Sequence, residues 1–341
     1  MKIALVTVAS SSGEKGGAER FYEGLASALS DAGAEVDSIS LISDESNFDA
    51  IKESYLRFYE LDLSKYDGVV STKSPSYIIN HPNHVCYLVH TMRVFYDMFD
   101  KEFPHPDKSI LEHREFIRIL DTKALNSHRT KKIFSIGNEV SKRLNRYNHL
   151  ESEVMHPALL NDNFKQGEFG DYLFIPGRLH RWKRIDLLIE AVKLTESQVK
   201  LKIAGIGEDE FYFKRLAEGN KKIEFLGKIS DEELIELYSN ALAVPFVPFN
   251  EDYGYVTLEA FRSKKPVITC KDSGEPAYFV KNEINGFVCK PSPAELSKKM
   301  DFFYYNPETA KQMGEHGYLD TVNINWKNIA LKLLSVLDIR K

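Results

Sequence analysis

Several features that define common protein classes are absent from this chain of 341 residues. Its three cysteines, Cys86, Cys270 and Cys289, lie far apart without metal or redox spacing, which favours a reducing, cytoplasmic setting. Acidic residues outnumber basic ones by 50 to 45, which argues against general nucleic-acid binding. No apolar run approaches the length that spans a membrane. The remaining profile is that of a soluble globular protein.

Metal-binding patterns are also scarce. The chain has no Asp-x-Asp motif, and His81 and His84 frame Pro82-Asn83, which is more typical of a turn than of two metal ligands. We therefore expect neither a metal nor another cofactor. The basic residues in 128–146 leave peripheral contact with the inner face of a membrane open, although a solvated charged face is the simpler interpretation.

Strand and helix patterns alternate along almost the whole chain. Its length is large for one hydrophobic core and suits two domains. Alternating strands and helices are typical of parallel α/β sheets with right-handed crossovers. The pattern lapses around 155–170, and an amphipathic helix is expected at 326–337. We predict strands at 3–8, 35–41, 68–72, 84–89, 132–136, 172–175, 200–204, 223–226, 241–247 and 266–269, and helices at 18–32, 138–147, 186–194, 231–239 and 257–263.

Two glutamates eight positions apart, Glu251 and Glu259, form the most informative segment. Pro248 and Gly254 prevent a continuous helix before Gly254, so Glu251 belongs to a loop and Glu259 lies about one turn into a helix. The N–H groups at the start of that helix can bind an anion, and the two carboxylates can accept hydrogen bonds from sugar hydroxyls. On this segment alone, a capped surface helix is an equally good interpretation.

Three further loops follow predicted strands, where ligands bind in doubly wound sheets. Gly16 and Gly17 open a helix and allow close backbone approach to a ligand, or they serve only a tight turn. They do not form a G-x-G-x-x-G motif, which weakens the case for a nicotinamide cofactor. His90 is either a structural residue or a catalyst. Arg178 and Lys183 suit a diphosphate, or they form a solvated basic turn.

Taken in order, these loops resemble the family 4 retaining glycosyltransferases, also called glycosyl transferases group 1, which have the GT-B fold. The resemblance covers nearly the whole chain and is strongest from 174 to 291. Two departures stand out: Arg184 occupies a position where the family commonly has glycine, and Ser273-Gly274-Glu275-Pro276 replaces the usual Gly-Gly and downstream glutamate. The matching segments are Gly16-Gly17-Ala18-Glu19, Gly177-Arg178-Leu179 with Lys183, Ala204-Gly205-Ile206-Gly207-Glu208, Phe225-Leu226-Gly227-Lys228-Ile229-Ser230, Glu251-Asp252-Tyr253-Gly254-Tyr255-Val256-Thr257-Leu258-Glu259-Ala260 and Asn285-Gly286-Phe287-Val288.

The resemblance implies two facing Rossmann-like domains, 1–158 on the acceptor side and 159–322 on the nucleotide-sugar side, with a cleft between them. It also implies that the helix in 323–341 packs back on the first domain. A nucleotide-diphosphate sugar, GDP-mannose or a UDP-hexose, would lie mainly on the second domain without a metal. The acceptor would be a saccharide or a lipid-linked molecule, and the loops 72–79 and 93–106 are expected to select it.

The same resemblance assigns roles to individual residues. Arg178 and Lys183 would hold the diphosphate, Glu259 the ribose and Glu251 the transferred sugar, while His90 would face that sugar from the first domain. The predicted catalytic residues are His90, Arg178, Lys183 and Glu251. The predicted donor-binding residues are Gly16, Gly17, Arg178, Lys183, Gly207, Lys228, Ile229, Glu251, Tyr253, Gly254, Tyr255, Val256, Thr257 and Glu259.

The expected activity is retaining transfer of a hexosyl group, in cell-surface polysaccharide biosynthesis. Negative charge develops on the departing diphosphate, and the two cations and the helix start would stabilise it. Two alternatives stay open: a sugar-nucleotide epimerase on the same fold, and a non-catalytic subunit that binds nucleotide sugars.

Overall fold

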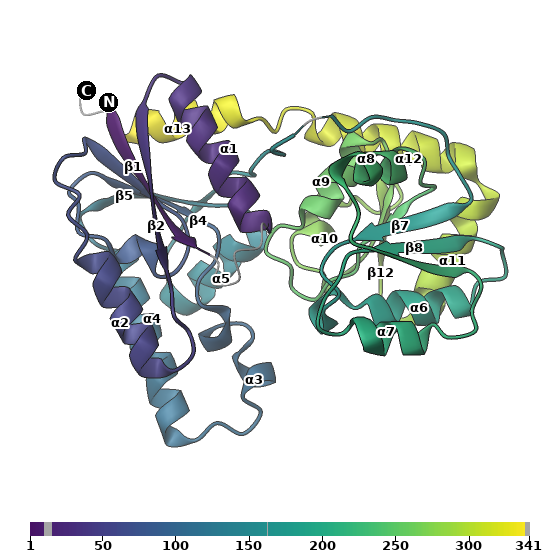
Figure 1. Ribbon diagram of the computed structural model, residues 1–341, viewed down its shortest axis with the longest axis horizontal. Coiled ribbons are helices and arrows are strands. Elements are labelled where there is room, and N and C mark those ends of the chain that lie inside the picture. The colour runs from purple at the N-terminus through teal and green to yellow at the C-terminus, as the bar shows by residue number, and fades with distance from the viewer. Residues whose placement is uncertain (10–15, 162, 338–341) are drawn as a thin grey trace. The chain divides into compact units, whose positions relative to one another are not determined.

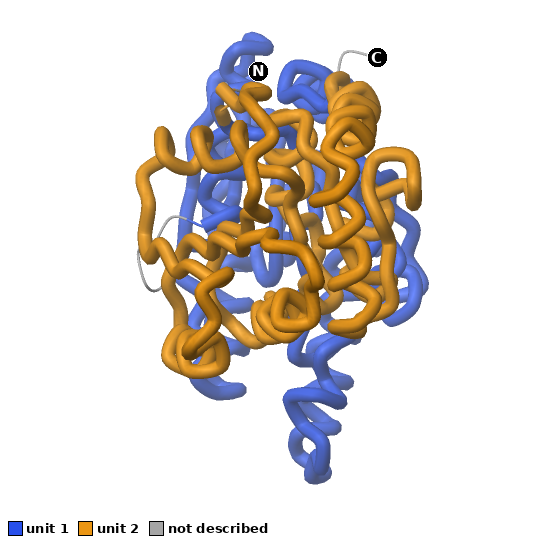
Figure 2. Tube along the Cα trace, turned by 90° about the vertical axis from the view of Figure 1, so that its right-hand side faces the viewer, with its two compact units in different colours: residues 1–160, 324–341 blue, residues 161–323 orange. Residues whose placement is uncertain are grey.

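The structure is a computed structural model that describes residues 1–9, 16–161 and 163–337. The chain divides into two compact units (Figure 2). The strands of each unit pair in parallel. Unit 1 comprises residues 1–160 together with 324–341, and unit 2 comprises residues 161–323. The chain therefore leaves unit 1, builds unit 2 and returns to unit 1 for its last helix.

Unit 1 contains a parallel six-stranded sheet in the order β2-β1-β3-β4-β5-β6. Six consecutive residues of β1 are buried, as expected for a strand covered by helices on both faces. Helices α1 and α13 lie on one side of the sheet and α2 and α4 on the other (Figure 1). The elements are β1 Lys2–Ala9, α1 Gly17–Asp31, β2 Glu35–Ile42, α2 Phe48–Tyr59, β3 Gly68–Ser71, β4 His84–Leu88, α3 Phe99–Glu102, α4 Lys108–Leu125, β5 Thr130–Ser135, α5 Asn138–Asn148 and β6 Glu153–Val154.

Unit 2 contains two three-stranded parallel ladders, β7-β8-β9 and β10-β11-β12. A bridge between Leu173 and Ala243 joins them. Helices α6 and α7 lie on one side of the strands and α8 and α12 on the other (Figure 1). The elements are β7 Tyr172–Pro176, α6 Ile185–Lys193, β8 Lys200–Ala204, α7 Glu210–Leu216, β9 Ile223–Gly227, α8 Asp231–Ser239, β10 Val244–Pro245, α9 Tyr255–Arg262, β11 Val267–Cys270, α10 Pro276–Phe279, β12 Gly286–Cys289, α11 Pro293–Tyr305 and α12 Pro307–Thr321.

One strand differs in extent from its sequence pattern. The apolar run 241–247 predicts a seven-residue strand, but the ladder is confined to β10, Val244–Pro245. Leu242 N–H donates to Tyr172 on β7, whereas Phe246 N–H donates to Ile268 on β11. Pro245 between them has no N–H to donate. The segment is therefore extended, and it changes neighbour instead of forming one regular strand.

Helix α13, Trp326–Leu337, packs on α1 within unit 1 (Figure 1). Its buried residues recur at helical spacing and include Ile329 and Leu333. The Trp326 ring packs on Gly24 of α1, where an added Cβ would lie 2.4 Å from the indole. Trp326 Nε1 also donates to Leu159 O at 2.9 Å. Any residue larger than glycine at position 24 would therefore collide with the Trp326 ring.

Among the described residues, no helix combines the length and apolar character needed to cross a bilayer.

Substituting Gly24 by alanine tests the contact between α1 and α13. Alanine is the better helix former by about 1 kcal/mol, but its methyl group must displace a rigid indole. We expect a net loss of about 1–2 kcal/mol in the free energy of unfolding, measured by denaturant titration. Ser27→Ala, at an exposed position on the same helix, is the control. A Gly24→Ala variant as stable as wild type would show that displacing the indole costs no more than the gain in helix propensity, and would contradict the expected net loss.

Candidate functional site

The loops after β7 and β10 meet through an ion pair in unit 2. Lys183 Nζ lies 2.6 Å from Glu251 Oε2, and the two side chains are 28% and 24% exposed. The backbone joins the same loops, because Phe249 N–H donates to Trp182 O at 2.8 Å. The sequence pattern predicted that both charged residues belong to one site. The structure places them in direct contact at the carboxyl edge of the sheet.

The loop after β11 holds Glu251 from its other side. Glu251 N–H donates to Ser273 O at 3.0 Å, and Glu251 O accepts from Glu275 N–H at 2.9 Å. Gly274 has a φ of +74°, and a Cβ there would lie 2.3 Å from Glu251 O. Only glycine satisfies both conditions at this close approach. The backbone of Glu251 is therefore fixed on two sides, although its side chain belongs to a loop.

Arg178, which follows β7, pairs with Glu208, which follows β8. Arg178 Nε donates to Glu208 Oε2 at 3.0 Å, and Arg178 Nη2 contacts the second carboxylate oxygen. Both side chains are largely exposed. The backbone N–H of Glu208 and then the guanidinium lower the pKa of Glu208. The segment Ala204–Glu208 contributed to the resemblance. No sequence signal showed that the Glu208 carboxylate would pair with Arg178, the predicted diphosphate ligand.

Helix α9 begins beside Glu251. Gly254, with a φ of +76°, precedes the helix, and Tyr255 and Val256 form its first turn. Thr257 N–H donates to Gly254 O at 2.9 Å, so this amide is used within the turn. Glu259 is 5% exposed, and its Oε2 accepts from Tyr238 OH at 2.7 Å.

The other predicted donor-binding residues of unit 2 differ in exposure. Lys228 is exposed and Ile229 half-buried after β9, and Tyr253 is buried against the Tyr255 ring at 4.9 Å. Gly207 lies where a Cβ would be 2.3 Å from Leu179 O, so the loops after β7 and β8 pack backbone to backbone.

Unit 1 carries the remaining predicted residues at the carboxyl edge of its own sheet. His90 follows β4, and its Nδ1 lies 2.9 Å from Thr91 O. A carbonyl only accepts, so Nδ1 carries a proton and donates to Thr91 O. Gly16 N–H donates to Glu19 Oε2 at 2.8 Å, and Gly17 begins α1. The preceding residues 10–15 lie outside the described part of the chain.

A buried carboxylate anchors the loops that carry His90. Asp121 on α4 is fully buried and accepts hydrogen bonds from Tyr55 OH and Tyr96 OH, both at 2.7 Å. Tyr55 OH lies 2.8 Å from Ser74 Oγ, and Ser74 N–H donates to His90 O at 3.1 Å. Burial raises the pKa of Asp121 to about 6, although hydrogen bonds from tyrosines oppose the shift. No local sequence motif announces this network.

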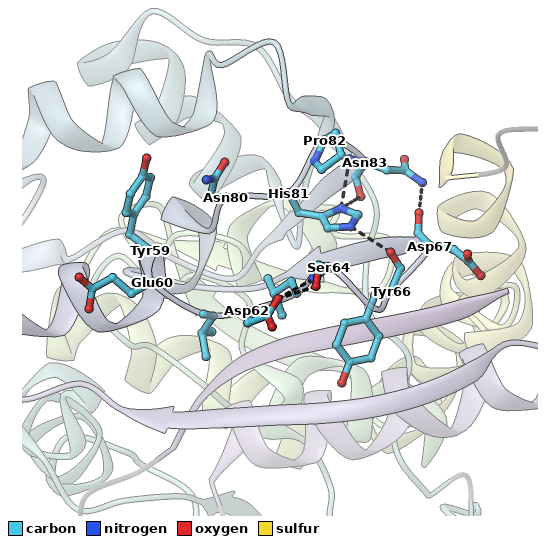
Figure 3. A pocket seen from close by; sticks show the side chains of 12 residues that line it. Tyr59, Glu60, Asp62, Ser64, Tyr66, Asp67, Asn80, His81, Pro82 and Asn83 are labelled. Carbon is cyan, nitrogen blue, oxygen red and sulfur yellow. Dashed lines mark hydrogen bonds between the residues drawn. The ribbon is translucent and has the colours of Figure 1, made fainter.

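A separate depression of about 790 Å³ lies at the amino edge of the unit 1 sheet (Figure 3). Its lining residues precede β3 and β4 and include none of the predicted site residues. His81 lies in it with Nε2 3.0 Å from Tyr66 O and Nδ1 3.1 Å from the Asn83 backbone (Figure 3). Both ring nitrogens therefore serve the turn. Among the residues described, no three His, Cys, Asp or Glu side chains group as metal ligands.

Residues 161–320, which include the ion pair and α9, match the model of the family glycosyl transferases group 1. This match covers nearly all of unit 2, residues 161–323. α-1,3/1,6-Mannosyltransferase ALG2 of Mus musculus is 27% identical over 229 residues, which is 58% of this chain and 53% of that relative. The chain spans about half the length of the curated relatives it matches.

Solved glycosyltransferase structures share the fold over nearly the whole chain. Sucrose-phosphate synthase from Thermosynechococcus elongatus superposes with a TM-score of 0.78 at 16% identity, over 98% of both chains. HepE of Anabaena, solved with UDP and glucose, gives a TM-score of 0.70 at 16% identity over 99% of both chains. The predicted GT-B fold, with two Rossmann-like α/β units, is confirmed.

The buried carboxyl of Asp121 predicts a pH-dependent stability. Its pKa is higher in the folded protein, about 6, than the ordinary 3.8, so the folded state binds the proton more tightly. This contribution is full below pH 4 and is lost as the pH rises through 6. Asp121→Asn is neutral throughout. We expect the unfolding free energy of wild type minus that of the variant to fall by about 2 kcal/mol between pH 4 and pH 7.5. A constant difference would contradict the raised pKa.

Proposed function

We propose that the chain is a family 4 glycosyltransferase that transfers a hexosyl group from a nucleotide-diphosphate sugar to a saccharide or lipid-linked acceptor. The observation that carries the proposal is the Lys183–Glu251 ion pair beside the start of α9. It combines a cation for phosphate, a carboxylate for sugar hydroxyls and a helix start in one place. The family match over 161–320 supports this interpretation.

The donor classes that we propose are GDP-mannose and UDP-hexoses. ALG2 is by name a mannosyltransferase, and HepE is solved with UDP and glucose. The diphosphate would bind near Arg178 and Lys183, and these two cations would supply the positive charge that a metal supplies in other enzymes. Glu259, which is mostly buried on α9, would accept from the ribose, and Tyr238 orients its carboxylate.

Charge development accounts for the proposed catalysis. As the bond between the anomeric carbon and the diphosphate breaks, negative charge grows on the leaving oxygen, where Lys183 and Arg178 stabilise it most strongly. The acceptor hydroxyl attacks the anomeric carbon from the face that the diphosphate leaves, so the configuration of that carbon is retained. The proton of the hydroxyl passes to the leaving phosphate oxygen. Glu251 would position the sugar through its hydroxyls. The Lys183 ammonium already engages one of its oxygens, which reduces its strength as a nucleophile.

Removing either member of the ion pair should strongly reduce transfer. We expect Lys183→Ala and Glu251→Ala each to lower kcat/KM by about 10²- to 10³-fold, because each variant loses a group that contacts the donor. The donor is first chosen from a panel of nucleotide sugars by thermal shift, since ligands raise apparent stability. Radiolabelled donor then distinguishes transfer from epimerisation and from binding alone.

The Lys264–Glu315 pair provides matched controls for this experiment. Its atoms are 2.8 Å apart and its lysine is 29% exposed, which closely matches Lys183, but it joins the residues after α9 to α12. Lys264→Ala and Glu315→Ala should therefore keep near-normal transfer. Near-normal transfer in Lys183→Ala and Glu251→Ala as well would overturn the proposed function.

Glu208 competes with a diphosphate for Arg178, since both are anions that bind the same guanidinium. Glu208→Gln should tighten the binding of UDP or GDP about two- to fivefold at low salt, because an exposed ion pair contributes at most about 1 kcal/mol. Calorimetric titration measures this change. Glu210→Gln is the matched control, because it removes the same charge nearby but from a pair with Lys214. Equal effects of the two variants would exclude direct competition.

A further inference from the structure

Arg184 has a backbone conformation that favours glycine. Its φ of +52° and ψ of +43° are left-handed, at the junction between Lys183 and α6. A residue with a side chain in this conformation costs about 1 kcal/mol or more relative to glycine. Glycine is also what the family commonly has at this position. An arginine here therefore needs a compensating contact from its side chain.

The guanidinium of Arg184 makes four short hydrogen bonds to two other loops. Nε donates to Val247 O at 2.6 Å, and Nη2 donates to Pro248 O at 2.8 Å. Both carbonyls belong to the segment between β10 and Glu251. Nη1 and Nη2 also donate to the two carboxylate oxygens of Asp272, at 2.9 and 2.8 Å. One side chain thus joins the loops after β7, β10 and β11.

The partners of Arg184 are themselves bonded to the backbone beside Glu251. Asp272 O accepts from Asn250 N–H at 3.0 Å, and the next carbonyl, Ser273 O, accepts from Glu251 N–H at 3.0 Å. Asn250 has a φ of +48°, a second left-handed residue without a glycine. Two strained residues therefore flank the Lys183–Glu251 pair, and the Arg184–Asp272 fork connects them.

We propose that Arg184 is a positioning residue for the donor site and that it acts through Glu251. Its planar fork sets the distance between the loop that carries Lys183 and the loop that carries Glu251. Lysine cannot replace it, because a single ammonium cannot reach two carbonyls and both oxygens of a carboxylate at once. Only the measurement of transfer activity that tests this inference rests on the proposed function.

A double-mutant cycle between Arg184→Gly and Glu251→Ala tests the proposal. Glycine removes the side chain and relieves the left-handed strain, so the variant should fold. We expect kcat/KM to fall about tenfold or more in Arg184→Gly and to stay low in Arg184→Lys. In the Glu251→Ala background, the same glycine substitution should have almost no further effect. Additive losses would show a general structural role and would overturn the proposal.

Lys264→Gly is the matched control. Lys264 also has a left-handed backbone, with a φ of +53°, and also loses an ion pair, but it lies between α9 and β11, before the strand and not in a loop that follows one. Its transfer rate should stay near wild type. If Arg184→Gly fails to fold, Asp272→Asn replaces it, because this variant keeps the backbone and weakens only the fork. The Asp272→Asn loss should likewise disappear in the Glu251→Ala background.

Hydrogen exchange separates this inference from the proposed function. In Arg184→Gly, the amides of Asn250 and Glu251 should exchange at least tenfold faster, while amides in β8 stay unchanged. Unchanged exchange at Asn250 and Glu251 would overturn the positioning role whatever the enzyme transfers. Faster exchange in a protein that transfers no sugar from any nucleotide sugar would overturn the proposed function and leave the positioning role standing.

Discussion

The candidate site of unit 2 is centred on the ion pair between Lys183 and Glu251. An isolated surface pair contributes little, but this one is three-quarters buried and lies within backbone bonds that already hold both loops. The two residues are 68 positions apart and come from different strand-to-helix connections. Their opposite charges lie 2.6 Å apart, where we propose that phosphate and sugar meet.

The parallel sheets explain why the candidate site residues gather. Every strand pair in both units is parallel, so successive carboxyl ends lie at one edge and successive loops share a surface. Short-range repulsions then set the detailed geometry. Gly207 and Gly274 allow backbones to touch where any side chain would collide. The chemistry of the site therefore rests on a few close backbone approaches more than on its charged side chains.

Sequence patterns predicted elements best where the local signals agreed. The predicted strand 200–204 and helix 231–239 coincide with β8 and α8, and Ser230 and Glu233 cap that helix reciprocally. The sequence patterns did not predict helices α2 and α4. Asn47 and Asp107 cap these helices, and such N-cap residues could have indicated where they begin.

The partners of the site residues could not be read from the chain. Glu208 lies 30 positions from Arg178, and Asp272 lies 88 positions from Arg184. Asp121 lies 66 positions from Tyr55. Such contacts depend on which strands become neighbours, and no local periodicity encodes that order. The departure at Arg184 was visible in the sequence, but its meaning required the positions of three loops.

The place of α13 in the chain has a consequence for synthesis on the ribosome. Unit 2 is continuous in sequence and can fold as soon as it emerges, whereas unit 1 needs a helix made after all of unit 2. Until then, the face of α1 around Phe21 and Gly24 has no Trp326 to cover it. Although most of unit 1 is synthesised before unit 2, it is completed after it, and during that interval its apolar helix face is open to chaperones or to misassembly.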